Sequence, residues 1–128
     1  MMNGERLRLL VVDDEADFTA FVRDFAGRFG YDVATAENGA VARERFREFG
    51  PHVVLLDMIM PQMDGVEFIE WLGSERANVR LVVVTGFNPN YGRLAEKLAE
   101  ARGLSSVVVL TKPVRVATLH RALRGDVD

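Results

Sequence analysis

Three carboxylates and one ammonium group in this sequence stand directly after short apolar runs, where such groups can bind a metal ion or act as nucleophiles. Asp13 and Asp14 follow one run, Asp57 follows a second and Lys112 a third. The carboxyl ends of parallel strands form the crevice in which an open sheet binds its ligands. Acids gathered there repel each other and need a cation. The chain has no cysteine and neither histidine is beside the acids, so the pattern favours Mg²⁺ over zinc.

Each candidate residue has a chemical interpretation and a plainer one. Asp57, held at a strand tip, could be a metal ligand, a nucleophile or both. Thr85, followed by Gly86, could hydrogen-bond an incoming phosphoryl oxygen, and Lys112 could bind that oxygen and pair with an aspartate before it arrives. Pro113 raises the chance of a cis peptide that aims the lysine inward. The plainer readings are that Asp13 or Asp14 simply caps the helix at 16–29, that Thr85 is an ordinary strand residue and that Lys112 is a surface lysine.

The elements that must position these residues alternate along the whole chain. Apolar runs predict strands at 7–12, 31–36, 53–56, 81–85 and 107–110. Helical spacing predicts helices at 16–29, from Asn38 to Gly50, at about 65–73, at 92–102 and from Val116 onward. Strict alternation of this kind predicts a parallel sheet with helices on both faces and right-handed crossovers.

A few residues are expected to set the ends of these helices. Gly30 is placed to end the first helix and Asn38 to cap the second. Asp64 and Glu67 resemble a capping box at the start of the third. The stretch 88–90, Asn-Pro-Asn, is expected to break the chain before the fourth.

Composition and charge exclude several classes of protein. The chain has 128 residues, of which 48% are hydrophobic and 27% charged, and we expect one domain at 1–124 with a short tail at 125–128. No apolar run approaches the ~20 residues of a membrane span. The absence of cysteine and of a signal-peptide pattern is compatible with a cytoplasmic protein. A net charge of −3 without a basic cluster gives no indication of nucleic-acid binding.

Four motifs, in this order, resemble the receiver domain of bacterial response regulators (CheY-like proteins). They are LVVDDE at 10–15, LLDMIMPQMDG at 55–65, VVVTG at 82–86 and TKP at 111–113. The resemblance spans nearly the whole chain. It implies a flavodoxin-like doubly wound α/β fold, with five parallel strands in the order 2-1-3-4-5 and five helices.

The resemblance also implies a role for each site residue. Asp57 would accept a phosphoryl group from a phosphohistidine on a histidine kinase or histidine phosphotransfer protein. Thr85 and Lys112 would then hold the phosphoryl oxygens, so that positioning and charge supply the catalysis. The domain would catalyse its own phosphorylation and the hydrolysis of the resulting phosphoaspartate. We expect that hydrolysis to be slow, because the apolar Ile59 and Phe87 would shield the phosphoaspartate from water.

The implied cofactor is Mg²⁺, held by four groups. Asp14 would ligate the ion directly and Asp13 mainly through a metal-bound water. Asp57 and the backbone carbonyl of Ile59 would complete the protein ligands.

One position departs from the family pattern. The family often carries an aromatic residue three positions before the lysine, and here that residue is Val109. Valine has no ring to turn, so we expect any switch to be read through Thr85, the 86–92 loop and the helix after it. Phe87 or Tyr91 could take the aromatic role, or both could merely pack.

The leading interpretation is a single-domain receiver that acts as a phosphorylation switch in a phosphorelay. We expect no effector domain to follow, and we therefore expect its output to pass through protein contacts. It could be a free regulator, a phosphorelay intermediate or a receiver excised from a hybrid kinase or larger regulator. A pseudo-receiver that binds partners without phosphorylation is a further alternative. A haloacid-dehalogenase-like phosphatase is remote, because its second aspartate would come two residues after the first, where this chain has Glu15.

Overall fold

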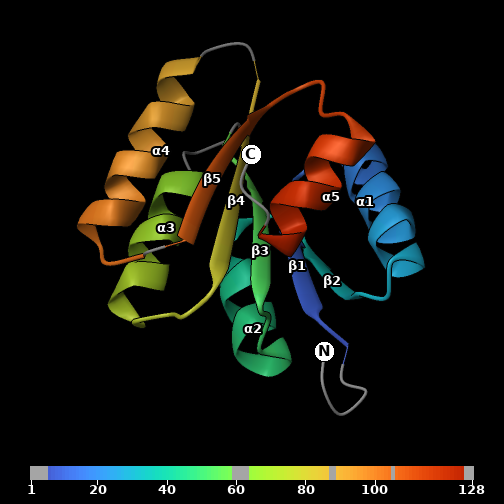
Figure 1. Cartoon of the computed structure of the whole chain (residues 1–128). Coiled ribbons are helices and arrows are strands. Elements are labelled where there is room, and N and C mark those ends of the chain that lie inside the picture. Colours follow the sequence, from blue (N-terminus) through green and yellow to red (C-terminus); the bar gives the residue numbers. More distant parts are fainter. Residues whose placement is uncertain (1–5, 59–63, 87–88, 105, 126–128) are drawn as a thin grey trace.

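The computed structural model describes residues 6–58, 64–86, 89–104 and 106–125, which form five strands and five helices in strict alternation (Figure 1). Their order is β1 (Arg8–Val12), α1 (Ala16–Arg28), β2 (Asp32–Ala36), α2 (Gly39–Phe49), β3 (Val53–Asp57), α3 (Asp64–Ser74), β4 (Arg80–Thr85), α4 (Pro89–Ala101), β5 (Ser106–Thr111) and α5 (Val116–Arg124). All paired strands are parallel, in the order β2-β1-β3-β4-β5. The predicted doubly wound sheet is therefore confirmed.

The sheet is covered by helices on both faces (Figure 1), and an apolar core lies between the helices and each face. Helices α1 and α5 cover one face, where Leu9 and Val11 of β1 point. Helices α2, α3 and α4 cover the other, toward which Leu10 and Val12 point. Successive strand residues face opposite sides of a sheet, so a strand covered on both sides must be apolar throughout. This explains the continuous apolar runs of the sequence.

The ends of α2 follow the prediction. The Asn38 side chain accepts a hydrogen bond from the Val41 N–H at 2.9 Å, and Gly50 ends the helix in the left-handed conformation with φ of 61°. Glycine adopts that conformation without the steric cost that a Cβ imposes.

One other helix end differs from the prediction, and one is not tested. Helix α4 begins at Pro89 rather than at 92, so the expected break at 89–90 is wrong. Proline suits the first turn of a helix, because its φ is already helical and the N–H that it lacks would have no partner there. The side chain of Asp64 lies outside the described part of the chain, so its predicted capping box stays a prediction.

The register of the sheet aligns the carboxyl ends of four strands along one edge. Val12 pairs with Leu56, and Thr85 pairs with Thr111. The Lys112 N–H donates to the Thr85 carbonyl at 2.8 Å, which extends the β4–β5 pairing by one residue. The residues that follow or end β1, β3, β4 and β5 therefore share one crevice. Within the described residues, no helix is long and apolar enough to cross a membrane.

Candidate functional site

The three aspartates predicted as metal ligands come together at this crevice. Asp13 and Asp14 follow β1 and Asp57 ends β3, and a carboxylate oxygen of each lies within 4.8 Å of the others. Asp13 and Asp57 are each only 3% exposed, whereas Asp14 is open to solvent. Two buried acids and one exposed acid thus form an oxygen-rich group with an open side.

The effect of this crowding is clearest in the pKa of Asp13. Burial, together with the nearby charge of Asp57, raises the pKa of Asp13 from 3.8 to about 7, against the lowering effect of the hydrogen bond from the Glu15 N–H and of Lys112. That N–H donates to Asp13 Oδ1 at 2.7 Å. Oδ2 is buried and has no hydrogen-bond partner among the described residues. A buried carboxylate oxygen without a donor favours a cation beside it.

Neither acid of the Asp13–Asp14 pair is the N-cap of α1. That position belongs to Glu15, whose side chain makes no capping hydrogen bond. The Asp13 carboxylate bonds the backbone N–H of Glu15, one step before the helix begins. The plain capping interpretation of these acids is therefore wrong.

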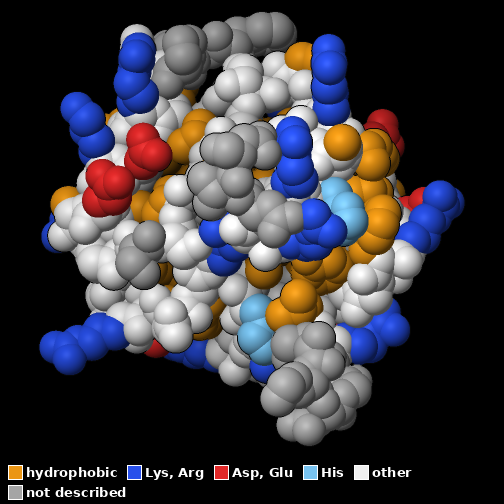
Figure 2. All heavy atoms as spheres, viewed as in Figure 1, with side chains coloured by type: hydrophobic (Ala, Val, Ile, Leu, Met, Phe, Trp, Pro, Cys, Tyr) orange, Lys and Arg blue, Asp and Glu red, His pale blue; other side chains and the backbone are white. Residues whose placement is uncertain are grey.

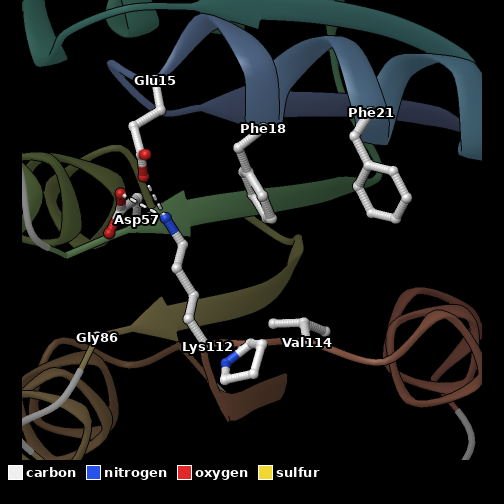
Figure 3. Close-up of a pocket in the computed structure, with 8 residues that line it drawn as sticks. Glu15, Phe18, Phe21, Asp57, Gly86, Lys112 and Val114 are labelled. Carbon is white, nitrogen blue, oxygen red and sulfur yellow. Dashed lines mark hydrogen bonds and ion pairs between the residues drawn. The ribbon is translucent and has the colours of Figure 1, made fainter.

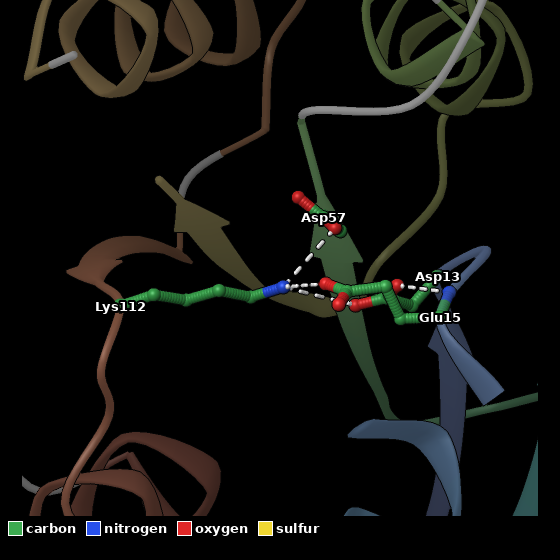
Figure 4. A network of polar contacts seen from close by, with 4 residues as sticks. All are labelled: Asp13, Glu15, Asp57 and Lys112. Atoms are coloured by element: carbon green, nitrogen blue, oxygen red, sulfur yellow. Dashed lines mark hydrogen bonds and ion pairs between the residues drawn. The ribbon is translucent and has the colours of Figure 1, made fainter. Parts of the chain in front are cut away.

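Lys112 reaches across the crevice to three carboxylates (Figure 4). Its Nζ lies 2.7 Å from Glu15 Oε1, 3.3 Å from Asp57 Oδ2 and 3.6 Å from Asp13 Oδ2. Burial lowers the pKa of Lys112, but the hydrogen bond to Glu15 and the charges of Asp57 and Asp13 outweigh it and raise the pKa above 10.5. The Nζ also lies 4.5 Å from the centroid of the Phe18 ring, a cation–π contact.

Sequence reasoning gave Glu15 no role, yet it makes the shortest ion pair of the lysine. The signal was its place as a third consecutive acid after the first strand. The predicted cis peptide between Lys112 and Pro113 is confirmed.

Thr85 is fully buried at the end of β4. Its Oγ1 has no hydrogen-bond partner among the described residues, although a buried hydroxyl normally has one. The next residue, Gly86, lines the same pocket as Asp57 and Lys112. The Thr85 hydroxyl therefore lies next to the crevice and is available to donate a hydrogen bond.

The crevice opens into a pocket of about 570 Å³ (Figure 3). Its charged end contains Glu15, Asp57 and Lys112. The remaining wall is largely apolar and comes from α1 and from the segment before α5, with Phe18, Phe21, Gly86, Pro113 and Val114 as lining residues. In Figure 3 the two phenylalanines lie side by side along α1, and Val114 lies across from them.

The apolar wall continues onto the molecular surface over α1 and α5. Figure 2 shows apolar side chains exposed there among lysine and arginine side chains. Phe21 is 42% exposed, Phe29 50% and Val116 48%.

Both histidines have packing or structural contacts. His120 packs on Phe29 with ring centroids 3.9 Å apart, and the His52 ring accepts a hydrogen bond from the Arg8 N–H.

Four residues named in the predictions remain to be placed. Ile59 and Phe87 lie outside the described residues. Val109 is half-buried and packs into the core on the α4 side of the sheet. Tyr91 is 37% exposed on α4.

Comparison with known proteins gives one consistent family. The sequence model described as "Response regulator receiver domain" matches residues 9–124. Sporulation initiation phosphotransferase F of Bacillus subtilis is 28% identical over 124 residues, which cover 97% of this chain and 94% of that protein. Chemotaxis protein CheY of the same species is 36% identical over 77 residues, 59% of this chain and 64% of that protein.

The match also extends to longer proteins and to solved structures. It covers 95% of this chain but only 26% of transcriptional regulatory protein ZraR of Klebsiella oxytoca, at 32% identity. A receiver domain protein of Clostridium thermocellum superimposes with a TM-score of 0.79 at 25% identity, covering 92% of this chain and 91% of that one. Vibrio cholerae chemotaxis protein CheY4 superimposes with a TM-score of 0.80 at 23% identity, covering 96% and 100%.

Proposed function

This chain belongs to the receiver domain family of response regulators, and we propose that it is a phosphorylation switch whose phosphoacceptor is Asp57. The observation that carries the proposal is the position of that carboxylate. It is buried at the end of β3, with Lys112 Nζ 3.3 Å away and two further aspartates beside it. A nucleophile held in one direction next to a fixed cation suits transfer of an anionic group.

The proposed chemistry is the transfer of one phosphoryl group. A carboxylate oxygen of Asp57 would form a bond to phosphorus as the bond from phosphorus to the donor's imidazole nitrogen breaks, and that nitrogen keeps the electron pair. Lys112 would offset the negative charge on the phosphoryl oxygens. The buried hydroxyl of Thr85, which has no partner in the described structure, would donate a hydrogen bond to one of them.

The acidic group fits a Mg²⁺ ion. Asp13, Asp14 and Asp57 offer oxygens within 4.8 Å of one another, and Asp13 Oδ2 has no donor within the described residues. We propose that these three residues hold the ion, and the backbone carbonyl of Ile59 stays a predicted ligand. When bound, Mg²⁺ would offset the charge of the acids and of the group being transferred.

The partner would be a histidine kinase or a histidine phosphotransfer protein, and the location cytoplasmic. The relative named a phosphotransferase supports a role in phosphoryl transfer. Matches to both short and long relatives leave a free regulator, a phosphorelay intermediate and part of a larger protein as alternatives. The family match favours all three over a haloacid-dehalogenase-like phosphatase.

Incubation with a small phosphodonor and Mg²⁺, followed by intact-mass measurement, tests this function. We expect wild type to gain one phosphoryl group that alkali and hydroxylamine remove, as they do from an acyl phosphate, and Asp57→Asn to gain none. Loss of the adduct in a chelator would support the Mg²⁺ requirement. An unmodified wild type, or an adduct that persists in Asp57→Asn, would refute the proposed function.

A further inference from the structure

The ammonium group of Lys112 has a partner that phosphotransfer does not require. We propose that Glu15 is a positioning residue that holds Lys112 in the resting domain and competes with the phosphoryl group for it. The inference rests on the proposed role of Asp57 as phosphoacceptor. According to this inference, Glu15, which is not one of the three clustered aspartates, makes phosphorylation of the resting domain less favourable.

The distances show which partner the lysine favours at rest. Its Nζ is 2.7 Å from Glu15 Oε1, against 3.3 Å from Asp57 Oδ2. An ammonium group has three N–H donors. Its neighbours within 4 Å already include three carboxylates, those of Glu15, Asp57 and Asp13. Two of its donors bond Glu15 and Asp57, and Asp13 Oδ2 lies beyond hydrogen-bond distance, so a phosphoryl group on Asp57 competes with these carboxylates for the charge of the ammonium group.

Glu15 is the contact that can be displaced most easily. Its side chain is 62% exposed, whereas those of Asp13 and Asp57 are buried. A carboxylate that leaves the lysine can turn into water from this position, so its charge stays solvated. The phosphoryl group also brings negative charge toward Glu15, and like charges repel. Both effects move Lys112 from Glu15 to the phosphoryl group.

Phe18 confines the lysine while this exchange takes place. It lies three residues after Glu15, on the same side of α1, and its ring centroid is 4.5 Å from Nζ. Figure 3 shows Glu15 just before α1 and Phe18 on that helix, both beside the lysine that spans the pocket. The ring keeps the ammonium group near Asp57 after the carboxylate leaves. Loss of the Glu15 contact should therefore free the lysine for the phosphoryl group without releasing it from the site.

The test compares four proteins by their affinity for beryllofluoride, a phosphoryl mimic, at saturating Mg²⁺. They are wild type, Glu15→Gln, Glu15→Asp and Asp17→Asn. Asp17 is the charge control, since it is an exposed acid in the first turn of α1 with no ion pair among the described residues. Glu15→Asp keeps the net charge but shortens the reach to Lys112. Circular dichroism checks that each variant is folded.

We expect Glu15→Gln to bind beryllofluoride about two- to fivefold more tightly than wild type in isothermal titration calorimetry, the range that a partly exposed ion pair can supply. Glu15→Asp should fall between the two, and Asp17→Asn should match wild type. The rate of modification by acetyl phosphate should rise in the same order.

Two outcomes overturn the inference and separate it from the proposed function. If Glu15→Gln binds no more tightly than Asp17→Asn while wild type still forms its Asp57 adduct, Glu15 is a surface ion pair and the competition is wrong. If wild type neither binds beryllofluoride nor forms the adduct, the proposed function fails, and the inference with it.

Discussion

Gly92 of α4 lies directly against Val109 of β5. A Cβ placed on Gly92 with ideal geometry would come within 2.6 Å of Val109 Cγ1 and 3.5 Å of Thr85 Cγ2. The first turn of α4 therefore packs on the two side chains next to the crevice, at the position where related domains often carry an aromatic ring. The Thr85 hydroxyl and methyl share one Cβ, so a rotation that turns the hydroxyl toward a phosphoryl group also moves the methyl that faces Gly92.

Substitution of Gly92 tests how tight this packing is. Gly92→Ala inserts a methyl where the neighbours leave no room, and we expect the free energy of unfolding to fall by about 1–3 kcal/mol. Urea denaturation measures the loss. Adding Val109→Ala removes Cγ1 and should restore part of the stability. A Gly92→Ala protein as stable as wild type would show that α4 does not rest on Val109.

The pKa of Asp13 predicts a pH effect on the metal-free protein. A carboxyl group whose pKa is higher in the folded chain than in the unfolded chain destabilises the fold as it ionises. The stabilising contribution of Asp13 is therefore complete below pH 3.8 and is lost as the pH rises through about 7. Asp13→Asn should remove this loss and raise the free energy of unfolding by roughly 1–3 kcal/mol at about pH 8.

Urea denaturation in a chelator, at about pH 5 and about pH 8, measures this effect as the difference between the two proteins. The advantage of Asp13→Asn should grow with pH. A constant difference would contradict a raised pKa for Asp13.

Binding of Mg²⁺ should stabilise the folded domain. At about one hundred times its dissociation constant, a ligand that binds only the folded state adds about 2.7 kcal/mol to the free energy of unfolding. We expect such a rise for wild type, its reversal by EDTA, and a much smaller rise for Asp14→Asn. Asp17→Asn serves as the control, because it removes an exposed acid outside the group. An equal response of Asp14→Asn would exclude that residue as a ligand.

Removal of the Lys112 charge should slow phosphorylation far more than it destabilises the fold. Lys112→Gln takes away the cation 3.3 Å from Asp57, and we expect the rate with a small phosphodonor to fall about 100- to 1000-fold. The other lysine of the chain, Lys97, is exposed on α4, so Lys97→Gln is the matched control. A rate within a few-fold of that control would assign Lys112 a structural role only.

The sequence by itself determined the elements and the edge at which chemistry gathers. Apolar spacing is a local property of the chain, so it predicted the five strands, the five helices and the parallel sheet. The placement of Asp57, Thr85 and Lys112 at strand ends then put them on one edge, whatever the strand order. That order came from the resemblance to receiver domains, since periodicity does not encode which strands are neighbours.

Only the tertiary structure decided the contacts between these residues. Glu15 and Lys112 are separated by 97 positions, and their ion pair depends on how the fold places the start of α1 relative to the end of β5. The close approach of Gly92 to Val109 depends likewise on the packing of α4. Strand and helix patterns repeat over a few residues, whereas side-chain distances across elements follow from register and packing. The sequence therefore identified the acids and the lysine, and the fold decided which acid holds the lysine at rest.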